Sequence, residues 1–312
     1  MSLFVVVDIG GTQIRAARFD GDHPEPLEVR RIPTRSSRGT AFERMCDLIS
    51  SVWPEHGRVE AVVVAVPGPL NPETGIVFSA PNIPGWENFP LRDRLAERFQ
   101  VPIHVGNDAN LAALGEWKFG AARGHHHVLY LTISTGIGGG VICDDRLLEG
   151  ARGLAGELGH ITVLPDGPTC GCGQRGHLEA LASGPGIARY VLAELGHGAK
   201  SVLRPSPDLS AREISEAAGQ GDALALAALE RAGAYIGLAL AGFLHMFNPS
   251  IVVFGGGVSF SGDLILAPVK RALTQHIMTP SYRDELTITT AALGDDAGLL
   301  GALALALFHH PH

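Results

Sequence analysis

The sequence predicts an α/β fold built from two similar halves. Runs rich in Val and Ile alternate along the chain with segments in which apolar residues repeat at helical spacing. Two segments of the form strand, glycine bend, strand lie a domain's length apart, at 4–20 and 127–145. Such a repeated opening indicates a duplicated architecture with a ligand between the halves. No Pro- or Ser-rich linker separates the halves, so we expect a hinge made of element ends.

The first half is predicted to open with a β-hairpin. Its β-branched run ends in Gly10 and Gly11, and the residues that follow reach their own Asp-Gly turn before a helix could form. A helix is predicted over 40–56, where Thr40 and Glu43 have the spacing of a capping box. The other predicted elements are strands over 59–66 and 101–105 and helices over 91–99 and 109–119.

The second half repeats the order of strand, glycine bend and strand. Its glycine bend is predicted over 136–140, and a further glycine cluster follows a buried strand at 255–257. Ser210 and Glu213 have the spacing of a second capping box. The other predicted elements are helices over 222–247, 263–276 and 296–308 and a strand over 286–292.

The most apolar stretch of the chain lies in the long predicted helix. Its segment "RAGAYIGLALAGFLHMF", which ends at Phe247, is shorter than the roughly 20 residues that span a bilayer. The spacing of Gly and Ala predicts instead a buried helix that packs closely on its neighbours and is stopped by Pro249.

Composition and charge narrow the class of protein. With 46% apolar and 18% charged residues among 312, the chain is an ordinary globular protein, long enough for two hydrophobic cores. The net charge of −8 argues against nucleic acid or a membrane as partner, because both select basic patches. No signal peptide is recognisable, and four cysteines do not form a disulfide framework, so we expect a cytoplasmic protein.

Three glycine clusters suggest phosphate binding. Glycine-rich bends after strands let backbone N–H groups approach phosphate oxygens, and the side chains of Thr12, Ser134 and Thr135 could add donors. Neither standard phosphate signature is present, since Val141 stands where G-x-G-x-x-G needs its last glycine. A single cluster is more often a tight turn, but three on one chain favour phosphate.

Asn107 and Asp108 lie at the end of a predicted strand and the start of a predicted helix. In open α/β sheets, ligands bind at that edge. One interpretation makes the pair a helix N-cap, which Asn and Asp both favour. The other makes Asp108 a general base that accepts a hydroxyl proton during phosphoryl transfer. The residues alone leave both interpretations open.

A Gly/Pro-rich loop, "HITVLPDGPTCGCGQRGHLEA" at 160–180, gathers two cysteines, two histidines and a carboxylate. Its C-x-C spacing is not that of a standard zinc finger. In an extended segment, however, residues two apart face the same side, so Cys170 and Cys172 could both reach one ion.

Taken together, the chain resembles the ROK family of sugar kinases, and most closely its bacterial glucokinases, over nearly its whole length. Six segments carry the resemblance in the family's order: the first phosphate motif "DIGGTQIRAA", the sugar-domain loop "VPGPLNPETGIVFSAPNIPGWENFPL", the catalytic segment "NDANLAALGEWKFGAARG", the second phosphate motif "LTISTGIGGGVI", the signature "GLAGELGHITV" with "CGCGQRGHLEA", and the adenosine motif "VVFGGGVS".

The resemblance implies the duplicated actin-like ATPase fold, which is ribonuclease H-like and shared with hexokinases. Its two lobes would be a small one over 1–117 and 296–312 and a large one over 118–295 that carries a zinc-binding loop at 160–179. The active site would lie in the cleft between the lobes, and closure would exclude water that competes with the sugar. A homodimer is also implied.

The implied activity is ATP-dependent phosphorylation of a hexose at its 6-hydroxyl, with glucose as the first candidate and ATP and Mg²⁺ as cofactors. Kinases for N-acetylmannosamine, mannose, fructose or allose remain open, as does polyphosphate as the phosphoryl donor. Some family members are sugar-responsive repressors with an N-terminal helix-turn-helix. This chain begins directly on the phosphate strand and retains Asp108, so we expect an enzyme.

The resemblance also assigns site residues. Asp108 is the implied base, and Asp8 would help to place Mg²⁺-ATP. The implied sugar-binding residues are Gly68, Asn82, Asn107, Asp108, Glu157, His160 and Glu179. The implied nucleotide-binding residues are Asp8, Gly10, Gly11, Thr12, Thr135, Gly136, Gly138, Gly256 and Gly257.

A structural zinc ion is implied as well, with one departure from the family. The family binds zinc through one histidine and three cysteines, which correspond to His160, Cys170, Cys172 and position 177, and here that position is His177. Because two Cys and two His form a normal closed zinc site, we expect zinc binding to survive. The alternative is an empty loop with His177 on the surface. The histidines at 125–127 and in the C-terminal "HHPH" are predicted to be solvated.

Overall fold

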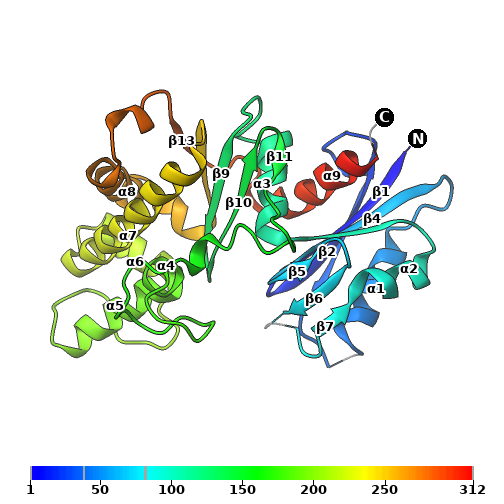
Figure 1. Ribbon diagram of the computed structural model, residues 1–312. Helices are drawn as coiled ribbons and strands as arrows, with labels where there is room; N and C mark the ends of the chain where they lie inside the picture. The colour runs from blue at the N-terminus through cyan, green and yellow to red at the C-terminus, as the bar shows by residue number, and fades with distance from the viewer. Residues whose placement is uncertain (1, 38, 81–82, 311–312) are drawn as a thin grey trace. The chain divides into compact units, whose positions relative to one another are not determined.

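The computed structural model describes residues 2–37, 39–80 and 83–310 (Figure 1). The chain divides into two compact units, and its described residues include two five-stranded sheets. Unit 1 comprises Met1–His125, Gly140–Gly156 and Ala292–His312, and unit 2 comprises His126–Gly139 and Glu157–Ala291. The lobe boundaries expected from the sequence stay a prediction.

The main sheet of unit 1 has the strand order β3-β2-β1-β4-β8. Its first three strands pair antiparallel, and β4 pairs in parallel with both β1 and β8. The predicted hairpin is therefore confirmed as β1 and β2. The strands are β1 (Leu3–Ile9), β2 (Gln13–Asp20), β3 (Glu28–Pro33), β4 (Val59–Val66) and β8 (Ile103–Asn107).

The helices of unit 1 follow the predicted positions closely. The capping box of α1 is confirmed, because Thr40 and Glu43 accept each other's backbone N–H groups. This helix ends at Ser51, five residues before the predicted end at 56. Its buried Met45 and Ile49 belong to the same core as the valines of β1 and β4. The helices are α1 (Ala41–Ser51), α2 (Leu91–Phe99), α3 (Asp108–Lys118) and α9 (Ala297–His309).

Two of these helices, α3 and α9, pack closely although they are far apart in sequence (Figure 1). Gly301 makes the close approach possible, because a Cβ atom there would overlap the carbonyl of Leu111. A Cβ atom at Gly115 would lie 2.9 Å from the carbonyl oxygen of Ala297. The backbone of α9 is thus held directly against the backbone of α3.

A small three-stranded sheet in unit 1 was not predicted. It has the order β5-β6-β7 and pairs antiparallel throughout. The strands are only two to four residues long and are separated by Gly- and Pro-containing turns, which hides them from a search for periodicity. They are β5 (Leu70–Asn71), β6 (Ile76–Ser79) and β7 (Glu87–Pro90).

The second sheet has the strand order β11-β10-β9-β12-β13. Strand β12 pairs in parallel with β9 and β13, and the two-residue β11 pairs antiparallel with β10. The predicted repeat of strand, bend and strand is confirmed as β9 and β10. The strands are β9 (Val128–Ile133), β10 (Ile137–Cys143), β11 (Arg146–Leu147), β12 (Ile251–Gly255) and β13 (Thr287–Thr290).

The second glycine bend is narrower than the sequence suggested. The turn covers Ser134–Gly136, and the following glycines continue as strand β10. They allow close packing rather than bending, since a Cβ atom at Gly139 would lie 2.8 Å from the carbonyl oxygen of Tyr130. The prediction of a bend over 136–140 was therefore wrong for its last four residues, 137–140, which belong to the strand.

The helices of unit 2 include the long predicted helix, α7. It contains 25 residues and is, by length and composition alone, long and apolar enough to cross a membrane. The sequence argument that its apolar stretch is too short to span a bilayer was therefore wrong. The prediction of a buried helix is confirmed, because Gly233 and Gly237 pack directly on α8. The helices are α4 (Leu178–Ala182), α5 (Gly184–Gly196), α6 (Ala211–Gly219), α7 (Ala223–Phe247) and α8 (Asp263–His276).

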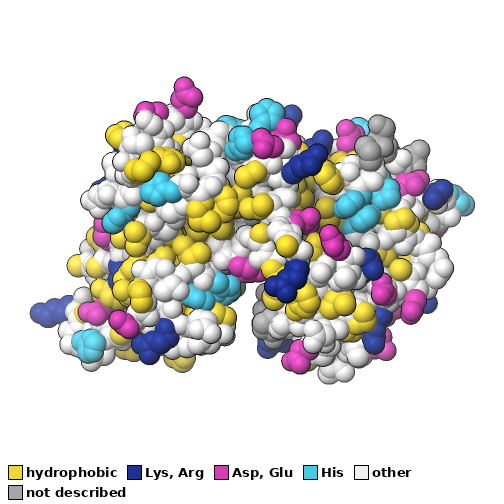
Figure 2. Space-filling model, viewed as in Figure 1, with side chains coloured by type: hydrophobic (Ala, Val, Ile, Leu, Met, Phe, Trp, Pro, Cys, Tyr) yellow, Lys and Arg dark blue, Asp and Glu magenta, His cyan; other side chains and the backbone are white. Residues whose placement is uncertain are grey.

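Charge is mixed over the visible surface. Lys and Arg side chains are scattered singly among Asp and Glu on the face drawn in Figure 2. A continuous basic patch, which a nucleic acid would select, is not seen on that face. The picture agrees with the net charge of −8.

The C-terminal histidines differ from the expected solvated tail. His309 is exposed, but its ring stacks on His104 of β8 at a centroid separation of 4.1 Å. His310 is half-buried, and its Nε2 lies 3.2 Å from Nε2 of His104. Burial, together with these imidazoles and Arg92, lowers the pKa of His104 to about 4.

His104 is therefore expected to destabilise the protein in mild acid. The unfolded chain takes up a proton on this imidazole near pH 6.5, while the folded protein resists it down to about pH 4. The free energy of unfolding should fall as the pH is lowered through that window. Between pH 7 and pH 4.5, urea unfolding should show a smaller fall in the free energy of unfolding for His104→Phe than for wild type. An equal fall in both proteins would contradict the lowered pKa of His104.

Candidate functional site

The catalytic segment joins the end of β8 to the start of α3. Asn107 is the N-cap of α3, since its Oδ1 accepts the backbone N–H groups of Ala109 at 3.0 Å and Asn110 at 3.1 Å. Its Nδ2 donates to the carbonyl of Gly68 at 3.2 Å, which brings two predicted sugar-binding residues together. The helix-capping role thus belongs to Asn107.

Asp108 is the first residue of α3 and is only partly buried. Its Oδ1 accepts the N–H of Ala109 at 2.8 Å. A carboxylate at this position lies where the helix dipole stabilises negative charge. Asn107 is the N-cap of the helix, and the carboxylate of Asp108 lies directly beside this cap at the first helical position.

Asp8, at the end of β1, is paired with an arginine that the sequence reasoning missed. Nη2 of Arg15 lies 2.7 Å from Oδ2 of Asp8, and both side chains are less than one-fifth exposed. Arg15 also donates to the carbonyl of Asp295 and to Oδ1 of Asp296 at 3.4 Å, just before α9. Asp8 and Arg15 face each other across the hairpin, so the hairpin register is the signal that could have found the pair.

The first phosphate bend connects β1 to β2. The N–H of Gly10 donates to the carbonyl of Gln13 at 2.9 Å, which closes the turn. The hydroxyl of Thr34 donates to the carbonyl of Gly10 at 2.6 Å and supports it from the neighbouring segment. Gly11 and Thr12 are exposed at the tip, where an anion could approach their backbone.

The second phosphate bend is held by Glu179, a predicted sugar ligand. The N–H of Ile137 donates to Oε2 of Glu179 at 3.0 Å, directly after Gly136. The other oxygen, Oε1, lies 3.4 Å from Sγ of Cys170. Glu179 therefore links the glycine bend to the cysteine loop.

A cavity of about 880 Å³ opens beside the second bend within unit 2. It is lined by the bend, by α5 and α6, and by the short helix η2 (Gly257–Ser261). Thr135 and Gly257, both predicted to bind nucleotide, line the same cavity. The volume is within the range of small-molecule sites, and the walls combine apolar residues with Arg189, Arg212 and Glu216.

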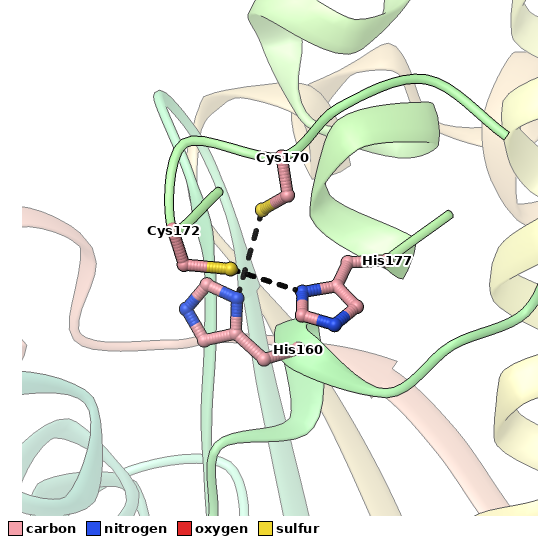
Figure 3. A group of neighbouring side chains, drawn as sticks. All are labelled: His160, Cys170, Cys172 and His177. Carbon is pink, nitrogen blue, oxygen red and sulfur yellow. Dashed lines mark hydrogen bonds between the residues drawn. The ribbon is translucent and has the colours of Figure 1, made fainter. Parts of the chain in front are cut away.

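Figure 3 shows four side chains of the cysteine loop pointing toward one another: His160, Cys170, Cys172 and His177. Their ligand atoms all lie within 4.8 Å of one another. Nδ1 of His160 is 3.7 Å from Sγ of Cys170, and Nδ1 of His177 is 3.2 Å from Sγ of Cys172. His177 is only 8% exposed, so the alternative that placed it on the surface was wrong.

The donor set fits a structural zinc ion. Two sulfur and two imidazole ligands are a normal tetrahedral set, and the short distances between them leave room for one small ion at their centre. Burial raises the pKa of the Cys170 thiol to about 11, so zinc binding would release its proton. Nε2 of His160 lies 3.9 Å from Oε2 of Glu157, a carboxylate that can orient this ring.

Burial also raises the pKa of Glu157 itself, while His160 opposes that shift. Glu157 immediately precedes the short helix η1 (Leu158–His160), which supplies the first histidine of the cluster. The two carboxylates expected to touch the sugar, Glu157 and Glu179, therefore both adjoin the candidate metal ligands.

Comparison with known proteins assigns the family. The ROK family model matches residues 4–308, nearly the whole chain. The chain belongs to the ROK family. It is 38% identical to the glucokinase of Thermotoga maritima, over 96% of this chain and 95% of that one, and 35% identical to the glucokinase of Streptomyces coelicolor, over 98% of both.

Solved ROK structures match this ROK protein over nearly its full length. A ROK family glucokinase from Streptomyces griseus, in complex with glucose and AMPPNP, has 36% identity and a TM-score of 0.81 and covers 97% of this chain and 99% of its own. A ROK hexokinase from Thermus thermophilus has 37% identity and a TM-score of 0.82, with coverage of 99% and 100%. The predicted duplicated actin-like ATPase fold is confirmed.

A ROK family transcriptional regulator is also similar in structure. It has 27% identity and a TM-score of 0.87, and the match covers 97% of this chain but 77% of the regulator. The shared fold therefore does not by itself separate kinases from regulators.

Several predicted site residues come together and one cannot be placed. Asn107 donates a hydrogen bond to Gly68, and Glu179 accepts one from the backbone of the second bend. The ligand atoms of the four candidate zinc ligands lie within 4.8 Å of one another. Gly256 follows β12 and has φ of +81°, whereas Gly138 lies inside β10. Asn82 lies outside the described residues. Sequence reasoning missed Arg15, which the hairpin register could have shown, and the buried Glu116, two of whose three hydrogen-bond partners are distant in sequence.

Proposed function

We propose that this ROK protein is a cytoplasmic, ATP-dependent hexose kinase that phosphorylates the 6-hydroxyl of glucose. The observation that carries the proposal is the end-to-end match to glucokinases, with 35–38% identity over 95–98% of two of them. The place of Asp108 at the start of α3 supports it, because its carboxylate directly follows Asn107, which is bonded to Gly68, and both are predicted to bind the sugar.

In the proposed reaction, Asp108 is the general base. The 6-hydroxyl oxygen bonds to the γ-phosphorus of ATP, the bond from that phosphorus to the β,γ-bridging oxygen breaks, and ADP leaves. The hydroxyl proton passes to the carboxylate of Asp108. Asn107 and Gly68, joined by a hydrogen bond, would position the sugar beside it.

The polar residues Asn82, Glu157, His160 and Glu179 are proposed to bind the sugar hydroxyls. A site built from hydrogen-bonding groups discriminates strongly, because a ligand that lacks a hydroxyl leaves buried polar groups unpaired. Glu179 also supports the second bend, so its loss should affect both substrates.

Glu179→Gln is therefore expected to raise KM for glucose by about 10- to 100-fold, equivalent to one or two lost hydrogen bonds to a charged group. KM for ATP should rise less, because Glu179 would affect the nucleotide only indirectly, through its hydrogen bond to the N–H of Ile137 beside the second bend. Steady-state kinetics with both substrates measure the effect. The matched control is Glu194→Gln on α5, where a partly exposed carboxylate faces His197, and an effect of the same size there would contradict the assignment.

The nucleotide is proposed to occupy the cavity beside the second bend. Its adenosine would lie near Gly256 and Gly257, and its phosphates would meet Thr135, Gly136 and Gly138. In unit 1, Gly10 closes the turn, and the exposed backbone of Gly11 and Thr12 would bind phosphate. Asp8 would help to hold Mg²⁺, which offsets the negative charge of the transferring phosphoryl group.

A zinc ion bound by His160, Cys170, Cys172 and His177 is proposed as a structural brace. It would hold the loop that carries Glu157 and Glu179 without contacting the sugar. The proposal rests on the mutual approach of the four ligand atoms within 4.8 Å.

The proposal is tested by an ADP-release assay with glucose, mannose, fructose, allose and N-acetylmannosamine, and with ATP or polyphosphate as donor. Glucose with ATP should give the highest kcat/KM. Preference for another hexose would keep the protein a hexose kinase but change its substrate. No activity on any hexose would favour a regulator function, like that of one structural relative. Light scattering on the same sample tests the proposed homodimer.

A further inference from the structure

Glu116 is a fully buried carboxylate without a role in the proposed chemistry. It lies near the end of α3, with a relative exposure of 0%. A buried carboxylate is costly unless hydrogen bonds compensate for the lost water, so its partners must be accounted for.

Three backbone N–H groups from two distant segments supply those partners. Ala121, in the turn after α3, donates to Oε2 at 2.8 Å. Ala292 donates to Oε2 at 3.1 Å and Leu293 to Oε1 at 2.9 Å, from a segment about 176 residues farther along the chain. Glu116 therefore joins the exit of α3 to the residues that lead into α9.

The same segment before α9 is bonded a second time, at its other end. Arg15 donates to Asp295 and Asp296, and it is paired with Asp8. A Cβ atom at Gly298, in the first turn of α9, would lie 2.6 Å from Cγ of Asp8. Residues 292–298 are therefore held by Glu116 on one side and by the Arg15–Asp8 pair on the other.

Helix α3 connects Glu116 to Asp108, its first residue. Because α3 and α9 pack through glycines with their backbones in contact, a shift of one helix cannot be absorbed by side chains. Glu116 thus links the end of α3, whose first residue is Asp108, to the segment that leads into α9.

We propose that Glu116 is a positioning residue for phosphoryl transfer, an inference that rests on the proposed function. By bonding Ala121, Ala292 and Leu293, it fixes α3 and the start of α9 in one arrangement. The orientation of Asp108 toward the sugar hydroxyl depends on that arrangement. Small displacements of such groups cost large factors in rate.

Glu116→Gln tests the proposal, because the amide keeps the shape but turns an N–H₂ group toward backbone donors. We expect kcat for glucose to fall about 10- to 100-fold with KM for glucose changed less than about threefold, the pattern of an interaction used only in the transition state. Hydrogen exchange of a peptide covering 289–296 should become faster. Unchanged kcat in the folded enzyme would overturn the proposal.

A double variant separates positioning from general stability. If Glu116 acts through Asp108, then Glu116→Gln should cost less than about threefold in an Asp108→Asn background, where transfer is followed with radiolabelled ATP. An equal loss in both backgrounds would overturn the inference. Full activity of Asp108→Asn itself would instead refute the proposed base, so the two failures are distinguishable.

The matched control is Asp222→Asn, at the N-cap of α7. This carboxylate also accepts two backbone N–H groups, from Val202 at 2.8 Å and Ala225 at 2.9 Å, but it lies in unit 2. Its loss should lower Tm by about 2 to 4 °C and leave kcat unchanged.

A second variant covers the case in which Glu116→Gln does not fold. Gly120→Ala places a Cβ atom onto the carboxylate of Glu116 and displaces it without removing it. This variant should lower kcat, as Glu116→Gln does. Wild-type kcat and wild-type exchange of 289–296 in this variant would contradict the proposal.

Discussion

Asp108→Asn is expected to lower kcat for glucose phosphorylation by about 10²- to 10⁴-fold, the usual contribution of a general base. The amide keeps the size and polarity of the side chain and can still accept the N–H of Ala109. It cannot take up the hydroxyl proton. KM for glucose should change little, because Asn107 still caps α3 and holds Gly68. Steady-state kinetics with saturating ATP measure the loss.

The matched control for this prediction is Asp263→Asn. Asp263 is also the first residue of a helix, α8, and is exposed. It should lose only the small dipole contribution to stability, about 0.3 to 1 kcal/mol, with kcat unchanged. A comparable fall in both variants, or wild-type kcat in Asp108→Asn, would contradict the assignment of the base.

Loss of zinc is the second large effect that we expect. Protein purified without a His-tag should contain one zinc per chain, and Cys172→Ser should lower the zinc content below about one-fifth of that value, because a structural site needs its full set of four ligands. Metal binding contributes directly to folding, so Tm should fall by about 5 to 10 °C. KM for glucose should rise, since Cys170 adjoins Glu179.

Cys143→Ser is the control for the zinc prediction, because Cys143 lies on β10 outside the cluster. It should keep its zinc and its Tm. The role of His177 is read separately: His177→Ala should lose zinc like Cys172→Ser. Zinc well below one per chain in wild type, or full zinc in His177→Ala, would show that these four side chains are not the ligands.

Much of the fold could be predicted because its signals are local. The hairpin follows from a β-branched run that ends at Gly10 and Gly11, and α1 begins at a capping box formed by two residues three apart. The four candidate zinc ligands, which the family resemblance implied, likewise lie within eighteen residues, from His160 to His177. In such cases the interacting residues are close in sequence.

The parts that could not be predicted depend on distant contacts or short elements. His309 and His310 were expected in solvent because nothing near them in sequence indicates a contact with His104 of β8. Two of the three partners of Glu116 are the backbone N–H groups of Ala292 and Leu293, which carry no side-chain signal in the sequence. Similarly, the strands β5 to β7 are too short to show periodicity.

Product identification tests the central claim most directly. Wild-type protein is incubated with Mg²⁺-ATP and glucose, and the product is identified by phosphorus and proton NMR, with Asp108→Asn in parallel. The account predicts glucose 6-phosphate and ADP in equal amounts from wild type, and at least about 100-fold slower formation with the variant. Phosphate on another hydroxyl, ATP hydrolysis without sugar phosphate, or equal rates from both proteins would contradict it.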